Sequence, residues 1–261
     1  MLDLENIQIP PLSTVTVKVM QFDPLGENAS SYALEQIVAP DEAVCADLLR
    51  IANSAYYGRS GRVKTLKDAI TLLGLKTVKN VVILLASKSM NGALKGKVFL
   101  KYLNEFTVAS ALVAEELCDS LGFKKHKEEA FLGALLHKIG MTIIALNERK
   151  MYSELIEETE KSFGDLVEEE RRRFGTDHVQ VGTQVFEHWK LPQQLQEVIA
   201  LHNFAPDDME DMSDLVRLTA LASLTTREMM GLLLSMNDLE RRAKITAHYN
   251  ADDLINKYNE K

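Results

Sequence analysis

The chain has 261 residues, of which 46% are hydrophobic and 26% are charged, and its formal net charge is −8. This composition is typical of a folded protein with one large core or two smaller ones. The acidic balance argues against a nucleic-acid backbone or an anionic membrane as the main partner, because both require a concentrated positive surface.

The amino terminus and the cysteines predict the compartment. Met1–Glu5 has neither the basic segment nor the apolar run of a signal peptide, and the longest aliphatic stretch, Val81–Ala86, is too short to span a bilayer. Cys45 and Cys118 lie among apolar neighbours with no other cysteine close in sequence, which predicts reduced, buried thiols. We therefore expect a cytoplasmic protein.

Apolar residues recur at helical spacing nearly throughout, and no stretch alternates with period two, so we expect an all-α, multi-helical fold. The Thr65 and Asp68 pair predicts a capped helix start, and Gly74 predicts the end of that helix. Helices are expected over about 40–53 and 65–74. A further helix follows Gly74 and runs to about residue 91, another covers about 98–120, and one begins at Pro192.

The glycines at 92 and 96 interrupt the helical pattern, and we expect a subdomain boundary there. The prediction is an N-terminal helical subdomain of residues 1–95 and a C-terminal helical subdomain of residues 96–261. Because no proline-rich linker separates them, we expect the two to share an interface and to form a groove.

Three histidines, His137, His178 and His202, occupy inward-facing positions of their predicted helices, whereas His188 falls near a helix end. A single buried imidazole needs only one hydrogen-bond partner, so a structural role explains any one of them. Three together favour a shared polar pocket, with Lys138 at its rim or paired to an acidic group, since an unpaired buried ammonium is costly.

Three other segments each allow two interpretations. The charge run 168–173 suggests a basic anchor or, because each arginine follows a glutamate at helical spacing, a solvated ion-pair face. Residues 53–58 suggest a partner surface or an ordinary helix end. The apolar residues within 229–236 suggest a docking patch or core packing.

Several blocks of the sequence resemble the HDOD domain in order and spacing. They are Ile9–Leu12, Ile37–Asp41, Leu48–Gly58, Ala69–Gly74, Ala134–Gly140, Gly175–Gly182, Trp189–Pro192 and Leu201–Asn203. The resemblance implies an N-terminal helical subdomain, an HD-like C-terminal subdomain with further helices, and a bacterial signalling or regulatory module. It also implies a common fold with HD metal phosphohydrolases.

The metal-ligand pattern of those hydrolases is incomplete in this chain. By register, Phe106 replaces the first histidine, Lys138 replaces the aspartate after His137, and Asn203 stands where a second histidine often follows His202. No aspartate occurs within 215–224. A lysine charge about 4 Å from a divalent ion opposes its binding by roughly 8 kcal/mol at an effective dielectric near 20. We therefore expect no metal, no cofactor and no catalytic residue.

The predicted function is non-catalytic regulation by binding a protein partner or a small signalling ligand. The expected ligand pocket comprises His137, Lys138, His178, His202 and Asn203, and the expected partner surface comprises Asn53, Ser54, Tyr56 and Tyr57. The alternative is a residual metal-dependent phosphohydrolase or nucleotide-binding enzyme of the HD type. The identity of the partner and the oligomeric state stay open.

Overall fold

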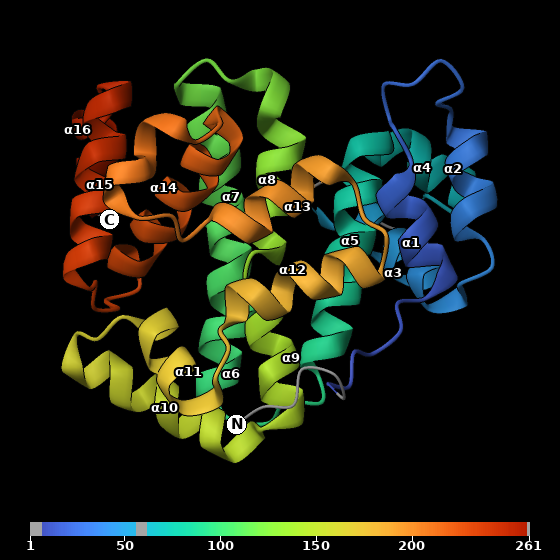
Figure 1. Cartoon of the computed structure of the whole chain (residues 1–261). Coiled ribbons are helices and arrows are strands. Elements are labelled where there is room, and N and C mark those ends of the chain that lie inside the picture. The colour runs from blue at the N-terminus through green and yellow to red at the C-terminus, as the bar shows by residue number, and fades with distance from the viewer. Residues whose placement is uncertain (1–6, 56–61, 260–261) are drawn as a thin grey trace. The chain divides into compact units, whose positions relative to one another are not determined.

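The structure is a computed structural model that describes residues 7–55 and 62–259 (Figure 1). Within these two ranges the chain folds into helices joined by short loops, and no residue is assigned to a strand. The all-α prediction is confirmed. The chain divides into two compact units, one of residues 11–89 and one of residues 1–10 with 90–261.

The unit of residues 11–89 is built around a small apolar core. Its helices are α1 (Thr14–Gln21), α2 (Ser31–Val38), α3 (Glu42–Ala52), α4 (Leu66–Leu73) and α5 (Leu75–Asn91), whose last residues pass into the other unit. The core residues Val19, Leu34, Leu48 and Ile70 are fully buried. The Thr65 side chain accepts from the Asp68 backbone N–H at the start of α4, as its sequence predicts.

The unit of residues 1–10 and 90–261 contains the remaining helices. They are α6 (Lys97–Phe99), α7 (Phe106–Ser120), α8 (Lys127–Leu136), α9 (Ile139–Asn147), α10 (Arg149–Ser162), α11 (Leu166–Phe174), α12 (His178–His188), α13 (Gln193–Leu201), α14 (Asp214–Met229), α15 (Met236–Tyr249) and α16 (Asp252–Asn259). A π-helical stretch, Leu100–Glu105, joins α6 to α7, so the long helix expected over about 98–120 is continuous but not uniformly α-helical.

The core of this unit is formed where α7 packs against α8 and α14. Phe106, Leu117, Leu136 and Leu218 are almost completely buried there. The stretch Lys124–Asn147 is long and apolar enough to cross a membrane, but 89% of its most apolar window is buried inside the protein. Its apolar side chains therefore belong to the core.

Two glycines bring α9 and α12 into backbone contact. A Cβ atom on Gly140 would lie 1.9 Å from the carbonyl oxygen of His178, and one on Gly182 would lie 2.8 Å from Cγ2 of Ile199. Only glycine fits at Gly140, because any side chain there would overlap a backbone oxygen. This contact holds the first residue of α12 beside the first turn of α9.

The segment of residues 7–10 is hydrogen-bonded to the same unit as α9 and α12. The backbone N–H of Gln8 donates to Oδ1 of Asn147 at 3.0 Å, and the Asn147 amide donates back to the Gln8 carbonyl at 3.2 Å. The indole N–H of Trp189 donates to the Pro10 carbonyl at 3.2 Å. These bonds tie the segment to the ends of α9 and α12.

The two thiols differ in their surroundings. Both cysteines are free, and Cys118 is buried, but Cys45 on α3 is only partly buried. The prediction of a buried thiol is therefore wrong for Cys45, because the face of α3 that carries it is only partly covered by neighbouring helices.

Candidate functional site

The structure brings His137, His178 and His202 together inside the unit of residues 1–10 and 90–261. The ring centroids of His137 and His202 are 5.1 Å apart, and those of His178 and His202 are 5.4 Å apart. All three side chains are at most 5% exposed. The histidines come from the end of α8, the start of α12 and the end of α13, so three separate helix termini meet at this point.

A buried carboxylate, that of Asp177, fixes the start of α12 and pairs with an arginine at the surface. The Asp177 side chain accepts from the Gln180 backbone N–H at 2.8 Å and so caps the helix. The Arg171 guanidinium on α11 donates to the same carboxylate at 2.6 Å. Because Asp177 is fully buried, these contacts leave His178 little freedom to move.

The hydrogen bonds of the rings determine which nitrogen atoms carry protons. Nδ1 of His137 lies 2.7 Å from the Ala134 carbonyl, and Nδ1 of His202 lies 2.9 Å from the Ile199 carbonyl. A carbonyl only accepts, so each Nδ1 donates, and each Nε2 presents a lone pair when the ring is neutral. Burial is the main cause that lowers the pKa of all three imidazoles well below the ordinary value.

The lone pair of His137 is already used. Its Nε2 lies 3.0 Å from Oγ of Ser223 on α14, whose hydroxyl donates to it. The ring of Phe106 lies 6.0 Å from the His137 ring, centroid to centroid, and covers it on another side. His137 is thus a satisfied core imidazole.

His178 and His202 face each other with a cation beside them. Their Nε2 atoms are 3.4 Å apart, and Nζ of Lys138 lies 3.4 Å from Nε2 of His178. Burial, followed by the charge of Arg227, lowers the pKa of Lys138 to about 8. The lysine is therefore still mostly protonated at neutral pH, and its ammonium donates to Nε2 of His178 when that ring carries its proton on Nδ1.

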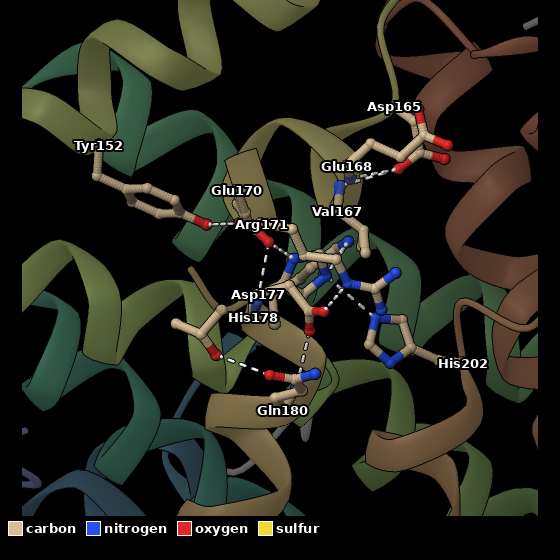
Figure 2. A network of polar contacts seen from close by, with 12 residues as sticks. Tyr152, Asp165, Val167, Glu168, Glu170, Arg171, Asp177, His178, Gln180 and His202 are labelled. Atoms are coloured by element: carbon tan, nitrogen blue, oxygen red, sulfur yellow. Dashed lines mark hydrogen bonds and ion pairs between the residues drawn. The ribbon is translucent and has the colours of Figure 1, made fainter. Parts of the chain in front are cut away.

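Behind His178 lies a fully buried carboxyl, that of Glu170 on α11. Its Oε2 accepts from the backbone N–H of His178 at 2.8 Å and lies 2.7 Å from the Nδ1 of the same residue. The Tyr152 hydroxyl donates to the other oxygen, and Figure 2 shows Tyr152 and His178 approaching Glu170 from different sides. Burial raises the pKa of Glu170, although these donors and Lys138 oppose the shift.

The interpretation of the charge run 168–173 as a solvated ion-pair face is wrong for Glu170, which is fully buried. Arg172 pairs with Glu169, and Arg173 pairs with Glu158 at 2.6 Å, as expected of a solvated face. Glu170 instead points inward, because Tyr152 and His178 supply the hydrogen bonds that compensate for its burial.

These residues do not suit a divalent metal ion. The protonated amine of Lys138 lies against Nε2 of His178, and Nε2 of His137 is bonded to Ser223. Within residues 7–55 and 62–259, no group of three or more His, Cys, Asp or Glu side chains is arranged to hold a metal. The predicted lack of metal in the purified protein stays a prediction.

A cavity of about 30 Å³ adjoins the histidines. Lys138, His178, His202 and Asn203 line it, whereas His137 is fully buried behind it. The predicted location of Lys138 at a pocket agrees with the structure, but in the described part of the chain no carboxylate forms an ion pair with its amine.

Sequence reasoning missed several residues that line the cavity. They are Asp165, Ser223, Arg227, Asp238 and Arg241. All but Asp165 come from α14 and α15, which lie far from His137 and His178 in sequence. A helical stripe predicts which face of a helix is buried but not which other helices meet it.

The expected partner surface is only partly within the described residues, since Tyr56 and Tyr57 lie outside them. The Asn53 amide donates to the carbonyls of Leu49 and Val63, at 2.9 and 2.8 Å, and its oxygen accepts from the Val63 N–H at 3.1 Å. Ser54 is half-buried at the same helix end. Asn53 thus ties the end of α3 to Val63, and the partner role of this surface stays a prediction.

The segment 229–236 contains both buried residues, as core packing requires, and exposed ones, as a docking patch requires. Leu232 and Leu234 are buried, whereas Met229 is 45% and Met236 80% exposed. The leucines belong to the core, and the methionines lie at the surface.

Comparison with known proteins agrees with the sequence blocks. The model of the HDOD domain family matches residues 9–205. A protein of Treponema pallidum (strain Nichols), named "Uncharacterized protein", is 22% identical over 195 residues, which are 75% of this chain and 38% of that protein. The chain therefore spans less than half the length of this relative.

Solved structures share the fold over nearly the whole chain. An HDOD domain protein of unknown function from Geobacter sulfurreducens matches with a TM-score of 0.71 at 18% identity, covering 97% of this chain and 92% of its own. A "Putative phosphohydrolase" from Shewanella amazonensis SB2B matches with a TM-score of 0.70 at 24% identity, and the match covers 97% of this chain and 90% of that protein. A "Putative signal transduction protein" from Marinobacter aquaeolei VT8 matches with a TM-score of 0.68 at 20% identity, and the match covers 99% of this chain and 60% of that protein.

Proposed function

The chain belongs to the HDOD domain family, and from this premise we propose that it is a non-catalytic bacterial regulatory module. It acts in signal transduction by binding a protein partner or a small ligand. One observation carries the proposal: the Lys138 ammonium lies 3.4 Å from Nε2 of His178, beside imidazoles that could otherwise bind a metal.

The physical argument concerns charge. An HD-type hydrolase needs a divalent cation, and a lysine charge at about 4 Å opposes that cation by roughly 8 kcal/mol at an effective dielectric near 20. Deprotonation of Lys138 would relieve this repulsion. Because its pKa is about 8, removing the proton at pH 7 costs little free energy, so the lysine charge alone does not exclude a metal. The loss of the other ligands is therefore equally important: Phe106 supplies no donor atom, and Ser223 occupies His137.

The proposal places the protein in the cytoplasm without bound metal. Free thiols at Cys45 and Cys118 support a reducing compartment. The neutral, hydrogen-bonded state of His137 supports a structural rather than a ligating role.

A residual phosphohydrolase is the second candidate. The observation that favours it is the pair of Nε2 atoms of His178 and His202, 3.4 Å apart beside a cavity. A single bound ion would need further donors, and the cavity offers Asp238 and Asp165, each of which is already hydrogen-bonded.

The test combines metal analysis with turnover. The full chain, purified without chelators, is analysed for zinc, manganese and iron, and then assayed on bis(p-nitrophenyl) phosphate with each metal added. We expect well under one metal per chain and hydrolysis at the rate of a heat-denatured control. Metal near one per chain, or turnover that disappears in His178→Ala, would establish the enzyme instead.

A further inference from the structure

The cavity beside His178 contains more positive charge than its surroundings neutralise. Lys138, Arg227 and Arg241 line it, together with two carboxylates, Asp165 and Asp238. One cationic side chain is therefore in excess of the carboxylates that line the cavity. Glu170 behind His178 does not offset it at neutral pH, because burial raises the pKa of that carboxyl to about 8. Such an excess in a half-buried site is costly unless an anion from outside compensates for it.

The two carboxylates already have partners. Asp165 accepts from the Val167 and Glu168 backbone N–H groups at 2.9 and 3.3 Å, and so caps α11. Asp238 pairs with Arg241 at 2.5 Å and accepts from the Ser235 N–H at 3.3 Å. Their direct hydrogen bonds therefore go to the starts of two helices and to Arg241.

Lys138 and Arg227 make no direct contact of this kind with a carboxylate, although the charge of Arg227 lowers the pKa of Asp238 and the charges of Glu170 and Asp238 raise that of Lys138. Within the described part of the chain, neither forms an ion pair, and the Arg227 guanidinium donates to the Leu233 carbonyl alone. The Nε atoms of Arg227 and of the 2% exposed Arg241 are buried without a hydrogen-bond partner. The charge of Arg227 also lowers the pKa of Lys138, as expected of two cations that share one cavity.

The size of the cavity limits the anion. In a volume of this kind one water needs about 10–15 Å³. The cavity of about 30 Å³ thus has room for about two or three waters, which fits the two oxygens of a carboxylate more closely than the five heavy atoms of a phosphate or sulfate group. A single negative charge also matches the single cation in excess.

A larger groove continues from this cavity. It has a volume of about 280 Å³ and shares Asp165, Val167, Asn203 and Arg241 with the cavity. Asn237 and Phe204 contribute an amide and an aromatic surface to it. A ligand whose charged end occupies the cavity therefore has space for its remaining atoms in the groove.

We propose that this cavity binds the carboxylate group of a small ligand through Lys138 and Arg227, with the body of the ligand in the adjoining groove. The inference deepens the proposed function, on which it rests, because it assigns a chemical class to the ligand. It requires no chemistry on that ligand.

The test is an NMR titration of the full, metal-free chain with acetate at constant ionic strength, followed at the side-chain N–H signals of Arg227 and Arg241. Acetamide serves as the uncharged probe of the same shape, and sulfate as the larger dianion. We expect saturable shifts with acetate and none with acetamide. Absence of saturation with acetate, equal shifts with acetamide, or tighter binding of sulfate would overturn the proposal.

Variants assign the binding to these residues. Arg227→Gln and Lys138→Met each raise the Kd for acetate about tenfold or more, since a hydrogen bond to a charged group is lost. Arg173→Gln is the matched control, because Arg173 pairs with Glu158 outside the cavity and its loss leaves the Kd unchanged. Unchanged affinity in both cavity variants would overturn the assignment. Failure of acetate binding in metal-free, inactive protein would contradict this inference and leave the regulatory proposal standing.

Discussion

Nζ of Lys138 lies 3.4 Å from Nε2 of His178, so a lysine amine and a neutral imidazole share a buried site. Burial and Arg227 both disfavour the charged amine, and its pKa is lowered to about 8 from 10.5. This ammonium therefore lowers the stability of the folded protein at neutral pH, relative to an apolar side chain of the same length.

We predict that Lys138→Met raises the free energy of unfolding by about 1–3 kcal/mol at pH 7. Between pH 8 and 10 the unfolded wild type still binds the lysine proton that the folded state has lost, so wild-type stability rises with pH. The advantage of the variant should therefore shrink over that range. Urea unfolding at pH 7, 8, 9 and 10 measures it.

Lys161→Met is the control for that series, because Lys161 is exposed. Its effect should stay within about 0.5 kcal/mol, as is usual for surface substitutions. A Lys138→Met protein that is less stable than the wild type at pH 7 would show that the amine contributes more as a donor to His178 than it costs by burial.

A second prediction concerns Lys138→Asp, which restores the residue type of the hydrolase pattern. We expect no hydrolysis of bis(p-nitrophenyl) phosphate with added manganese or iron, because Phe106 still supplies no donor and Ser223 still occupies His137. Lys138→Asn is the uncharged control. Turnover in the aspartate variant alone would show that the assignment of Phe106 to a ligand position is wrong.

The glycine contact between α9 and α12 gives a third prediction. Gly140→Ala should lower the free energy of unfolding by about 3 kcal/mol or more, because its Cβ would meet a backbone oxygen that cannot move aside. Gly182→Ala should cost less, about 1–2 kcal/mol, since the atom it meets is a side-chain methyl of Ile199. Urea unfolding ranks the two, and the reverse order would contradict the backbone contact.

The buried histidines predict instability in acid. Their pKa values are lowered in the folded protein, so below about pH 6.5 the unfolded state binds more protons and stability falls as pH falls. Glu170 has the opposite effect over part of this range. Its pKa is raised in the folded protein, so there the folded state binds the proton that the unfolded state lacks. We predict that His137→Asn reduces the loss between pH 6.5 and 5 by up to about 1.4 kcal/mol per pH unit.

Ser223→Ala is the matched control for the acid series, because it removes the hydroxyl bonded to His137 and keeps the titrating ring. It should lower stability at every pH but retain the wild-type slope. A His137→Asn protein with an unchanged slope would show that this ring is not kept neutral by the fold.

The helices and the meeting of the three histidines could be predicted from periodicity and caps. Thr65 with Asp68 predicts the start of α4, and the apolar faces around His178 and His202 predict that both point inward. Short-range patterns suffice for such features because both the cap and the stripe are properties of a single helix.

The surroundings of the histidines could not be predicted in the same way. Glu170 belongs to a run of charges that is indistinguishable in spacing from a solvated face, and its burial depends on Tyr152, which precedes it on a different helix. Arg227 and Arg241 reach the cavity only through the packing of α14 and α15. Long-range packing of this kind leaves no periodic signal in one sequence.

The hydrogen bonds of residues 7–10 have a consequence for dissecting the protein. The chain passes between the two compact units twice, after residue 10 and after residue 89. A fragment that begins at residue 90 therefore lacks the acceptor for the Trp189 indole and the partner of the Asn147 amide. Conversely, a protease cut near residue 89 leaves residues 7–10 on the first fragment, so the bonds of Gln8 and Pro10 would then have to form between two separate chains.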